Sequence, residues 1–500
     1  MAESEPMTIT AVAEAAARRF GDQPAIVDGA RIVTFAGLWA ESQKIARAFA
    51  GAGLAKGDRV AIWAPNSPEW ILACVGAQAA GCVVVTLNTR LKGNEAAYIL
   101  NKSRARTLLT VHDFLDTDYP TLLAGEDLPH LERTICFGAE WDAFVATAPE
   151  SIALPAIAPD DACDILFTSG TTGDPKGVVA THGASVRSFR TWVNAVGLRA
   201  GDRYLIVNPF FHTFGYKAGW LACLIAGATI YPLAILDTKR LIDLVSTHRI
   251  SVLPGPPAIF QTLLATDLGD ADLSSLRLSI TGAASVPAAL IERMRSDLGI
   301  DTVLTGYGLT ESAGIVSISA ADDPAEIVAR TAGRPIPGIE VRIADPDESG
   351  AGEVLVRGFN VMRGYFEDDA ATAEAIDSDG WLHTGDIGRF EPGGELVITD
   401  RIKDMYISGG FNCYPAEIER ALQRHPDVAL AAVIGIPHER LGEVGKAFVV
   451  PRAGHRPDAD ELLVWARANM ANYKAPRSIE IVEALPLNAS GKVQKFALRP

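Results

Sequence analysis

The sequence predicts an α/β protein: a large N-terminal domain of two similar α/β subdomains plus a β-rich subdomain, and then a small α+β C-terminal domain. Two uncharged runs, Trp70–Leu87 and Ala218–Leu236, share one pattern: Leu-Ala-Cys in a helix, Ala-Gly, and an apolar strand. Alternation of helix and strand indicates mostly parallel sheets. After Gly338, short strand patterns between Gly, Asp and Pro turns replace this alternation.

The individual elements follow in order along the chain. Buried strands are predicted at Arg59–Trp63, Asp164–Phe167, Tyr204–Asn208, Ser251–Leu253 and Leu278–Thr281, with helices such as Thr238–His248 and Pro287–Leu298 between them. The β-rich subdomain has strands at Glu340–Ile343, Gly352–Arg357 and Glu395–Ile398. The last module has helices at Pro415–His425 and Asp458–Met470, and strands at Val428–Ile436 and Glu443–Val450. We expect domains at 1–400 and 401–500, the second of normal domain size.

Composition excludes several classes of protein. The 500 residues are 48% hydrophobic and 21% charged, which is typical of a globular enzyme and not of a disordered chain. Asp and Glu number 61 against 45 Lys and Arg, for a net charge of −16. This balance argues against nucleic-acid binding, which favours a basic surface. A local site for a single nucleotide needs only a few donors and is compatible with it.

Neither uncharged run is predicted to span a membrane, although both are long enough. Gly81 and Gly227 interrupt them and strand-like residues follow. Met1–Thr10 carries acids where a signal peptide has bases. The six cysteines form no C-x-x-C pair and the nine histidines show no metal-binding spacing, which argues against a zinc site or a disulfide framework. We expect a cytoplasmic protein.

The most informative stretch follows the strand Asp164–Phe167. Hydroxyls and glycines alternate there and a lysine follows, in the order Thr168, Ser169, Gly170, Thr171, Thr172, Gly173 and Lys176. Glycines let backbone N–H groups turn inward to hold an anion, and the hydroxyls and Lys176 add donors and charge. The common P-loop would need Gly at position 175 and Ser or Thr at 177, where this chain has Pro175 and Gly177. We expect a triphosphate-binding loop of another kind.

This stretch resembles the signature of acyl-adenylate-forming enzymes, the superfamily of acyl-CoA synthetases, peptide-synthetase adenylation domains and luciferases. Four further motifs resemble that superfamily in the same order: Gly306–Glu311 (GYGLTE), Trp381–Asp386 (WLHTGD), Asp400–Asp404 (DRIKD) with Ser408–Gly410 (SGG), and Pro486–Lys492 (PLNASGK). Together they cover the chain from about residue 160 to 495.

The resemblance implies ATP, Mg²⁺ and coenzyme A as cosubstrates and cofactor. Thr310 and Glu311 would act at the phosphates, with the Glu311 carboxylate as a hard oxygen ligand for Mg²⁺. Asp386 would accept hydrogen bonds from the ribose hydroxyls with help from Arg401. The adenine would stack on Tyr307, and small residues would let the base approach the backbone: Gly306, Gly308, Gly282, Ala283 and Ala284.

The resemblance also implies a mobile C-terminal domain. Lys492 would reach the α-phosphate and the substrate carboxylate, where a preorganised cation stabilises developing charge. Rotation about Lys403 would then withdraw Lys492 and bring Ser408, Gly409 and Gly410 to a channel for the thiol arm of coenzyme A. Glycines suit a narrow channel because they leave room for the thiol.

The acid-binding pocket is expected around His212. Asn208–Gly219 (NPFFHTFGYKAG) and Leu253–Pro257 (LPGPP) resemble actinobacterial ligases of the fatty-acyl-CoA-synthetase type. More narrowly, they resemble those that activate the propanoate-bearing hexahydroindanedione acid of steroid degradation. Pocket candidates are His212, Phe214, Tyr216, Lys217, Ser312 and Ala313. Lys217 would meet a ring carbonyl or lie at the surface. His212 is not expected to be a general base, because the acid is already ionised.

Three alternatives stay open: a ligase for medium- or long-chain fatty acids, an adenylating enzyme that loads a carrier protein, and a regulatory protein that binds ATP without activating an acid. The motif series with Lys492 favours an enzyme that takes a small-molecule carboxylic acid. The oligomeric state also stays open, with a homodimer as one option.

Overall fold

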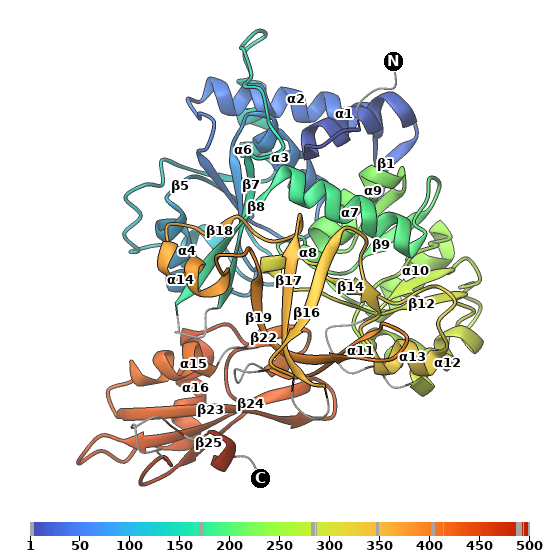
Figure 1. Ribbon diagram of the computed structural model, residues 1–500. Helices are drawn as coiled ribbons and strands as arrows, with labels where there is room; N and C mark the ends of the chain where they lie inside the picture. The colour runs from blue at the N-terminus through green and yellow to red at the C-terminus, as the bar shows by residue number, and fades with distance from the viewer. Residues whose placement is uncertain are drawn as a thin grey trace.

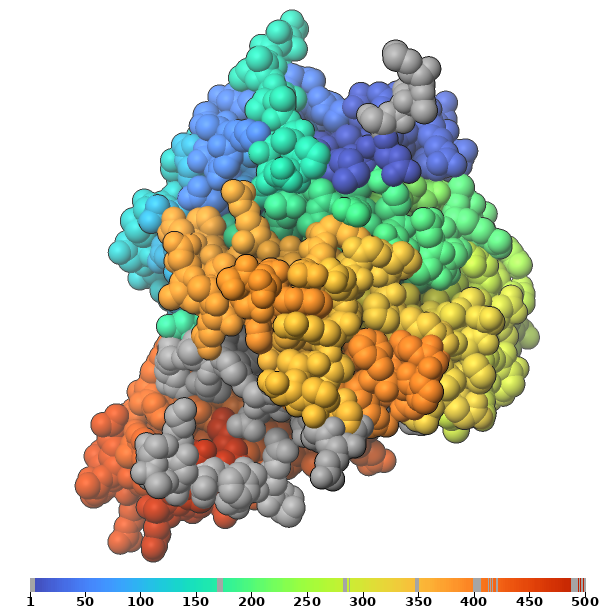
Figure 2. All heavy atoms as spheres, viewed as in Figure 1, coloured from blue at the N-terminus to red at the C-terminus, as the bar shows by residue number. Residues whose placement is uncertain are grey.

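The computed structural model describes residues 5–169, 174–281, 286, 288–346, 350–401, 406–413, 415–486, 493 and 495–498. Figure 1 shows two α/β layers in blue and green, a β-rich layer in orange, and a C-terminal module in red at one end. The space-filling view in Figure 2 shows this module as a separate bulge against the larger part.

The first subdomain is built on a mostly parallel sheet of strand order β18-β8-β7-β4-β3-β5-β6. Its parallel strands are β3 (Arg59–Trp63), β4 (Val83–Thr86), β5 (Ala105–Thr110), β6 (Arg133–Cys136) and β7 (Ala162–Ser169), and its antiparallel ones are β8 (Pro175–Thr181) and β18 (Gly364–Tyr365). Helix α3 (Pro68–Ala79) precedes β4, and Gly81 joins them at a φ of +82°, which favours glycine. The run Trp70–Leu87 is therefore a helix, a turn and a strand.

The second subdomain repeats this pattern. A π-helix η1 (Tyr216–Leu221) and helix α9 (Ala222–Ala226) lead through Gly227 to β10 (Thr229–Pro232). β10 pairs in parallel with β9 (Arg203–Ile206) and β1 (Pro24–Asp28), while β2 (Arg31–Thr34) adds an antiparallel edge. A parallel pair, β11 (Leu278–Ile280) with β12 (Thr302–Leu304), continues the second subdomain.

The equivalent helices of the two subdomains pack against each other in one apolar core. Trp70 of α3 lies 5.7 Å from Tyr216 and 6.2 Å from Trp220 of η1, measured between ring centroids. All three side chains are fully buried. Such edge-to-face contacts between aromatic rings stabilise a core beyond the area that they bury. The predicted likeness of the two runs thus corresponds to two helices that meet at the subdomain junction.

An antiparallel sheet forms the β-rich subdomain. Its order is β16 (Ile339–Ala344), β17 (Gly352–Gly358), β19 (Leu382–Phe390) and β20 (Leu396–Arg401). The C-terminal module follows, with the hairpin β21 (Tyr406–Ser408) and β22 (Phe411–Cys413), helices α15 (Pro415–Gln423) and α16 (Ala459–Asn469), and strands β23 (Val428–His438), β24 (Gly442–Pro451) and β25 (Ser478–Ile481). β20 ends at Arg401, so the domain boundary at 400 stays a prediction.

Local patterns therefore predicted most elements at their observed positions. One difference is Ser251–Leu253, predicted as a strand, which contributes only a bridge at Val252 between Tyr204 and Leu278. In the part of the chain that the structure describes, every helix falls short of the length and apolarity that crossing a bilayer would require.

Candidate active site

Side chains from four elements converge at the end of the β7–β8 hairpin. Thr168 and Lys176 face each other across β7 and β8. Thr168 Oγ1 donates a hydrogen bond to Glu311 Oε1 over 3.3 Å, and the Tyr365 hydroxyl of β18 donates to the same oxygen over 3.0 Å. The ammonium of Lys176 lies 5.2 Å from the centroid of the Tyr365 ring. Two residues predicted to act at phosphates, Thr168 and Glu311, are thus in contact although 143 positions separate them.

The predicted adenine and ribose residues are also in contact. The hydroxyl of Tyr307, in β13 (Gly306–Tyr307), donates to Asp386 Oδ2 over 2.6 Å. Asp386 is 2% exposed, and its backbone N–H donates to Thr384 Oγ1 over 3.1 Å. In the register of β19 and β20, Asp386 lies directly opposite Arg401. The hydrogen bond from Tyr307 holds the carboxylate beside the tyrosine ring.

The GYGLTE segment depends on a close backbone approach. A side chain at Gly308 would bring its Cβ within 2.3 Å of the Gly314 carbonyl oxygen, so this position accepts only glycine. Thr310–Ser312 forms a 3-10 turn, η2, in which Ser312 Oγ bonds to the backbone of Leu309. Ser312 in this turn and Ala313 directly after it, both predicted to line the acid pocket, are buried.

Ser408 and Phe411 close a tight hairpin between β21 and β22. The two residues between them, Gly409 and Gly410, have φ values of +57° and +83°. A two-residue hairpin loop with both φ values positive strongly favours glycine. The turn geometry therefore accounts for both glycines without any ligand.

His212 is an exposed residue in a loop whose backbone is hydrogen-bonded to the side chain of Asn66. Asn66 Nδ2 lies within hydrogen-bonding distance of the carbonyl oxygens of Asn208, Leu233 and Ile206, at 2.9, 3.2 and 3.3 Å, and its Oδ1 accepts from the Phe210 N–H over 2.7 Å. His212 Nδ1 accepts from the Phe214 N–H over 3.3 Å. Desolvation by the surrounding protein lowers the pKa of His212, although the residue is exposed. The imidazole is therefore neutral at neutral pH.

Tyr216 and Lys217 lie in the core. The Tyr216 hydroxyl accepts from Gln78 Nε2 over 2.7 Å, and its ring stacks on Trp220. Lys217, 1% exposed, has its ammonium 3.1 Å from the buried Asp164 Oδ1. A surface position for Lys217 is therefore wrong, and the reason is that Asp164 offsets its charge inside the fold. Phe214 is partly buried and packs against the same core.

Several predicted residues lie outside the described ones, so their roles stay predictions: Gly170, Thr171, Thr172, Gly173, Gly282, Ala283, Ala284, Lys403 and Lys492. The backbones of Ser169 and Arg401 are described as the last residues of β7 and β20.

Sequence reasoning missed Tyr365 and Asn66. Tyr365 lies in an unremarkable Arg-Gly-Tyr-Phe stretch, and its role depends on a strand pairing between residues almost 200 positions apart. The turn Ala64-Pro65-Asn66-Ser67-Pro68 after a buried strand was a usable signal for Asn66, because a polar residue there lies at the carboxyl edge of a parallel sheet.

The hydroxyls, carboxylates and lysine that the fold brings together are typical of an enzyme that uses a nucleotide. The family model for the AMP-binding enzyme matches residues 13–366, and that for the AMP-binding enzyme C-terminal domain matches residues 417–492. The chain belongs to the AMP-binding enzyme family.

Two relatives define its place within the family more closely. The chain is 46% identical to a 3-[(3aS,4S,7aS)-7a-methyl-1,5-dioxo-octahydro-1H-inden-4-yl]propanoyl:CoA ligase of Rhodococcus jostii, over 99% of both chains. It is 48% identical to a ligase of the same name from Mycobacterium tuberculosis, over 98% of both chains. The protein is an acid–thiol ligase that forms an acyl-CoA from a small-molecule acid, ATP and coenzyme A.

Two solved structures of one enzyme share the fold of this chain. The o-succinylbenzoate CoA synthetase of Bacillus subtilis, 30% identical, superposes with a TM-score of 0.86 when it is a double mutant bound to its product analogue, over 97% of this chain and 98% of that one. In its complex with AMP, the same enzyme superposes with a TM-score of 0.70 over 97% of both chains.

Proposed function

We propose that this ligase activates a fused-ring dione acid with a propanoate side chain, of the kind named for its two relatives. The observation that carries the proposal is near-full-length identity of 46–48% to two ligases for that acid. The pocket around His212 would be broad and apolar, with the neutral imidazole near the reacting carboxylate. Phe214, Ser312 and Ala313 would complete it, and Tyr216 and Lys217 would support it from the core.

The first half-reaction joins the acid to AMP. A carboxylate oxygen attacks the α-phosphorus, the bond between the α- and β-phosphates breaks, and pyrophosphate leaves with the electron pair. Residues 168–176 would hold the leaving group, Asp386 and Arg401 the ribose, and Tyr307 the adenine. Lys492 would offset charge at the reacting centre. Positioning and electrostatics would supply most of the acceleration.

Glu311 and Thr168 are the residues that fit Mg²⁺, because their oxygens converge within hydrogen-bonding distance. When bound, the ion would neutralise charge on the phosphates. In the second half-reaction, the coenzyme A thiol loses its proton to solvent and its sulfur attacks the acyl carbon. The bond from that carbon to the phosphate oxygen breaks, and AMP leaves with the electron pair. Residues 408–410 would border the thiol after rotation of the domain 401–500 about Lys403. We also expect a cytoplasmic enzyme, with a homodimer as its simplest assembly.

An acid panel tests the substrate. Purified protein is assayed for AMP release with ATP, coenzyme A and one acid at a time: the dioxo-octahydroindenyl propanoate, octanoate, hexadecanoate or ferulate. We expect the first acid to give the highest kcat/KM. A preference for a straight-chain acid would overturn the assignment. Lys492→Ala tests the chemistry, with an expected loss of roughly a hundred- to a thousandfold in adenylate formation.

A further inference from the structure

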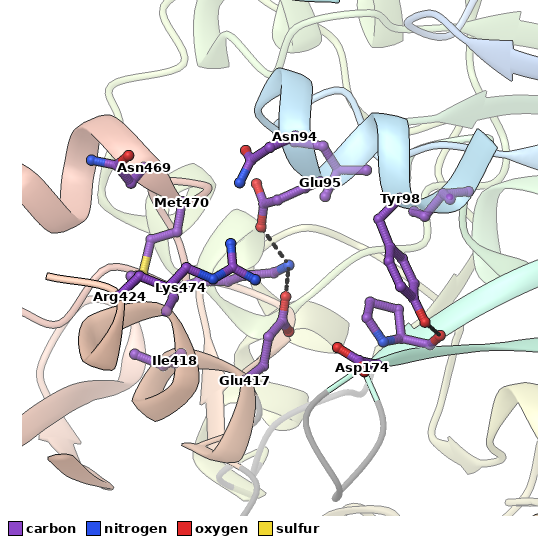
Figure 3. A pocket seen from close by; sticks show the side chains of 14 residues that line it. Asn94, Glu95, Tyr98, Asp174, Glu417, Ile418, Arg424, Asn469, Met470 and Lys474 are labelled. Atoms are coloured by element: carbon purple, nitrogen blue, oxygen red, sulfur yellow. Dashed lines mark hydrogen bonds and ion pairs between the residues drawn. The ribbon is translucent and has the colours of Figure 1, made fainter. Parts of the chain in front are cut away.

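A buried ion triad joins the C-terminal module to the large part of the chain (Figure 3). The ammonium of Lys474, just after α16, lies 2.9 Å from Glu95 Oε1 and 2.5 Å from Glu417 Oε1. Glu417 belongs to α15 of the same module, whereas Glu95 belongs to α4 (Gly93–Ser103) of the first subdomain. One of the two ion pairs therefore exists only when the two parts are in this arrangement.

The triad is well shielded from water. The Lys474 side chain is 5% exposed and each carboxylate side chain 14%. Burial works against the charged ammonium, but the two carboxylates outweigh it and raise the pKa of Lys474 well above its ordinary value. Removing one member of a buried charge pair is costly, since the remaining charge loses both its partner and its water.

A second contact links this region to the glycine hairpin. Asn88 Nδ2 donates to the Tyr473 hydroxyl over 3.1 Å. The Tyr473 ring stacks on Phe411 with centroids 4.6 Å apart, and Phe411 directly follows the Gly409–Gly410 turn. The guanidinium of Arg90 covers the same Phe411 ring at 4.8 Å. The residues that cross the interface thus also support the hairpin.

A pocket that opens to solvent adjoins the triad, and the three triad residues contribute to its lining. Tyr98 and Pro175 line it on one side, and Ile418 and Met470 on the other. Open space replaces continuous apolar packing here, so polar contacts such as the triad contribute to the orientation of the module.

The position of the C-terminal module can be compared with two complexes of one related enzyme. The Bacillus subtilis synthetase superposes better with its product analogue bound than with AMP bound, at TM-scores of 0.86 and 0.70. Sequence identity is 30% in both comparisons.

We propose that Glu95, Lys474 and Glu417, together with the Asn88–Tyr473 hydrogen bond, form a clasp that holds the module in the thioester-forming arrangement. These are positioning residues for the second half-reaction. The clasp would open for adenylation, when Lys474 keeps Glu417 and loses Glu95. The inference rests on the proposed ligase function.

Glu95→Gln tests the clasp, because it removes the charge that crosses the interface and keeps the size of the side chain. Glu95 Oε2 also accepts the Lys92 N–H over 2.8 Å, and glutamine retains an acceptor for that bond. With the dioxo-octahydroindenyl propanoate, we expect single-turnover thioester formation to fall about tenfold, as for loss of a charged hydrogen bond. Acid-dependent ATP–pyrophosphate exchange should stay within about twofold.

Two further variants separate the clasp from general destabilisation. Tyr473→Phe should lower thioester formation by about threefold, as for a neutral hydrogen bond, and leave ATP–pyrophosphate exchange unchanged. Glu480→Gln is the matched control, since it removes an ion pair of 2.7 Å with Lys446 inside the module and should change neither half-reaction. Equal losses in both half-reactions, or none, in Glu95→Gln would overturn the clasp.

Small-angle scattering provides a readout without substrate. Wild-type protein should fit this arrangement, and Glu95→Gln should show a broader distribution of distances. An unchanged curve would overturn the clasp whatever the acid proves to be. Absence of acid-dependent exchange in the wild type would instead overturn the proposed function, and the scattering result would still decide the clasp.

Discussion

Tyr307 and Asp386 are joined by a hydrogen bond of 2.6 Å that links β13 to β19. The bond brings together an aromatic ring and a carboxylate that belong to two motifs far apart in the sequence. A buried carboxylate needs such donors, since an unsatisfied charge is costly. We infer that the tyrosine orients Asp386 for the ribose as well as presenting its ring to the base.

Tyr307→Phe should therefore weaken ATP binding although the ring is retained. Loss of a hydrogen bond to a charged group costs about 1.5–3 kcal/mol, or roughly ten- to a hundredfold in the KM for ATP. Initial rates at varied ATP measure it, and kcat should change little. Tyr307→Ala should add a further loss of about 0.5–1.5 kcal/mol because stacking is lost too. An unchanged KM in Tyr307→Phe would argue against the orienting role.

Glu311→Gln should lower adenylate formation by about a hundredfold or more, since a charge that supports the phosphates is removed from a preorganised site. Pyrophosphate exchange measured over a range of Mg²⁺ concentrations should show a higher requirement for the ion. Thermal unfolding should shift little, because glutamine can still accept from Thr168 and Tyr365. Glu326→Gln, at the first turn of α13 (Ala325–Arg330), is the control and should behave as wild type. Loss of activity with an unaltered Mg²⁺ dependence would contradict the metal role.

Asn66→Ala should destabilise the protein and loosen the His212 loop. It would remove the acceptor of the buried Phe210 N–H and a donor to three backbone carbonyls, at about 1–3 kcal/mol for each group left unsatisfied. Urea unfolding measures the stability, and we expect the KM for the acid to rise more than the KM for ATP. Asn101→Ala removes one exposed bond to the Asp127 carbonyl and should cost less than about 1 kcal/mol. Equal changes in both KM values would count against a loop-specific effect.

His182 should make stability fall in acid. It is 1% exposed, its Nδ1 accepts the Ile9 N–H over 3.2 Å, and burial lowers its pKa to about 3. The unfolded chain, with an ordinary pKa near 6.5, therefore binds a proton that the folded state excludes. The free energy of unfolding is fully retained above about pH 6.5 and decreases by up to about 1.4 kcal/mol per pH unit as the pH falls toward 3.

Urea unfolding at several pH values between 7.5 and 5 measures this slope. His182→Asn offers an oxygen acceptor to Ile9 without a titrating group, so its slope should be smaller than that of the wild type. The exposed His130→Asn should keep the wild-type slope. Equal slopes in His182→Asn and wild type would assign the acid sensitivity to other groups.

Local sequence patterns predicted the elements because apolar periodicity and turn residues act over short distances. Thr238–His248 and Arg59–Trp63 were predicted with their observed bounds. At Ser251–Leu253 the pattern was too short, and neighbouring strands determined that Val252 forms only a bridge. The glycines at 409 and 410 were predicted from their motif, but their physical reason, two positive φ values in a hairpin, appears only in the structure.

By itself, the sequence determined the fold class, the family and the motifs of the candidate site, because each of these depends on short stretches of neighbouring residues. Only the tertiary structure decided which side chains meet: Tyr365 with Glu311, Asn66 with the His212 loop, and Lys474 with Glu95, 379 positions away. Lys217 shows the physical reason. Whether a lysine lies at the surface or in the core depends on a partner such as Asp164, which only the folded chain brings within reach of its charge.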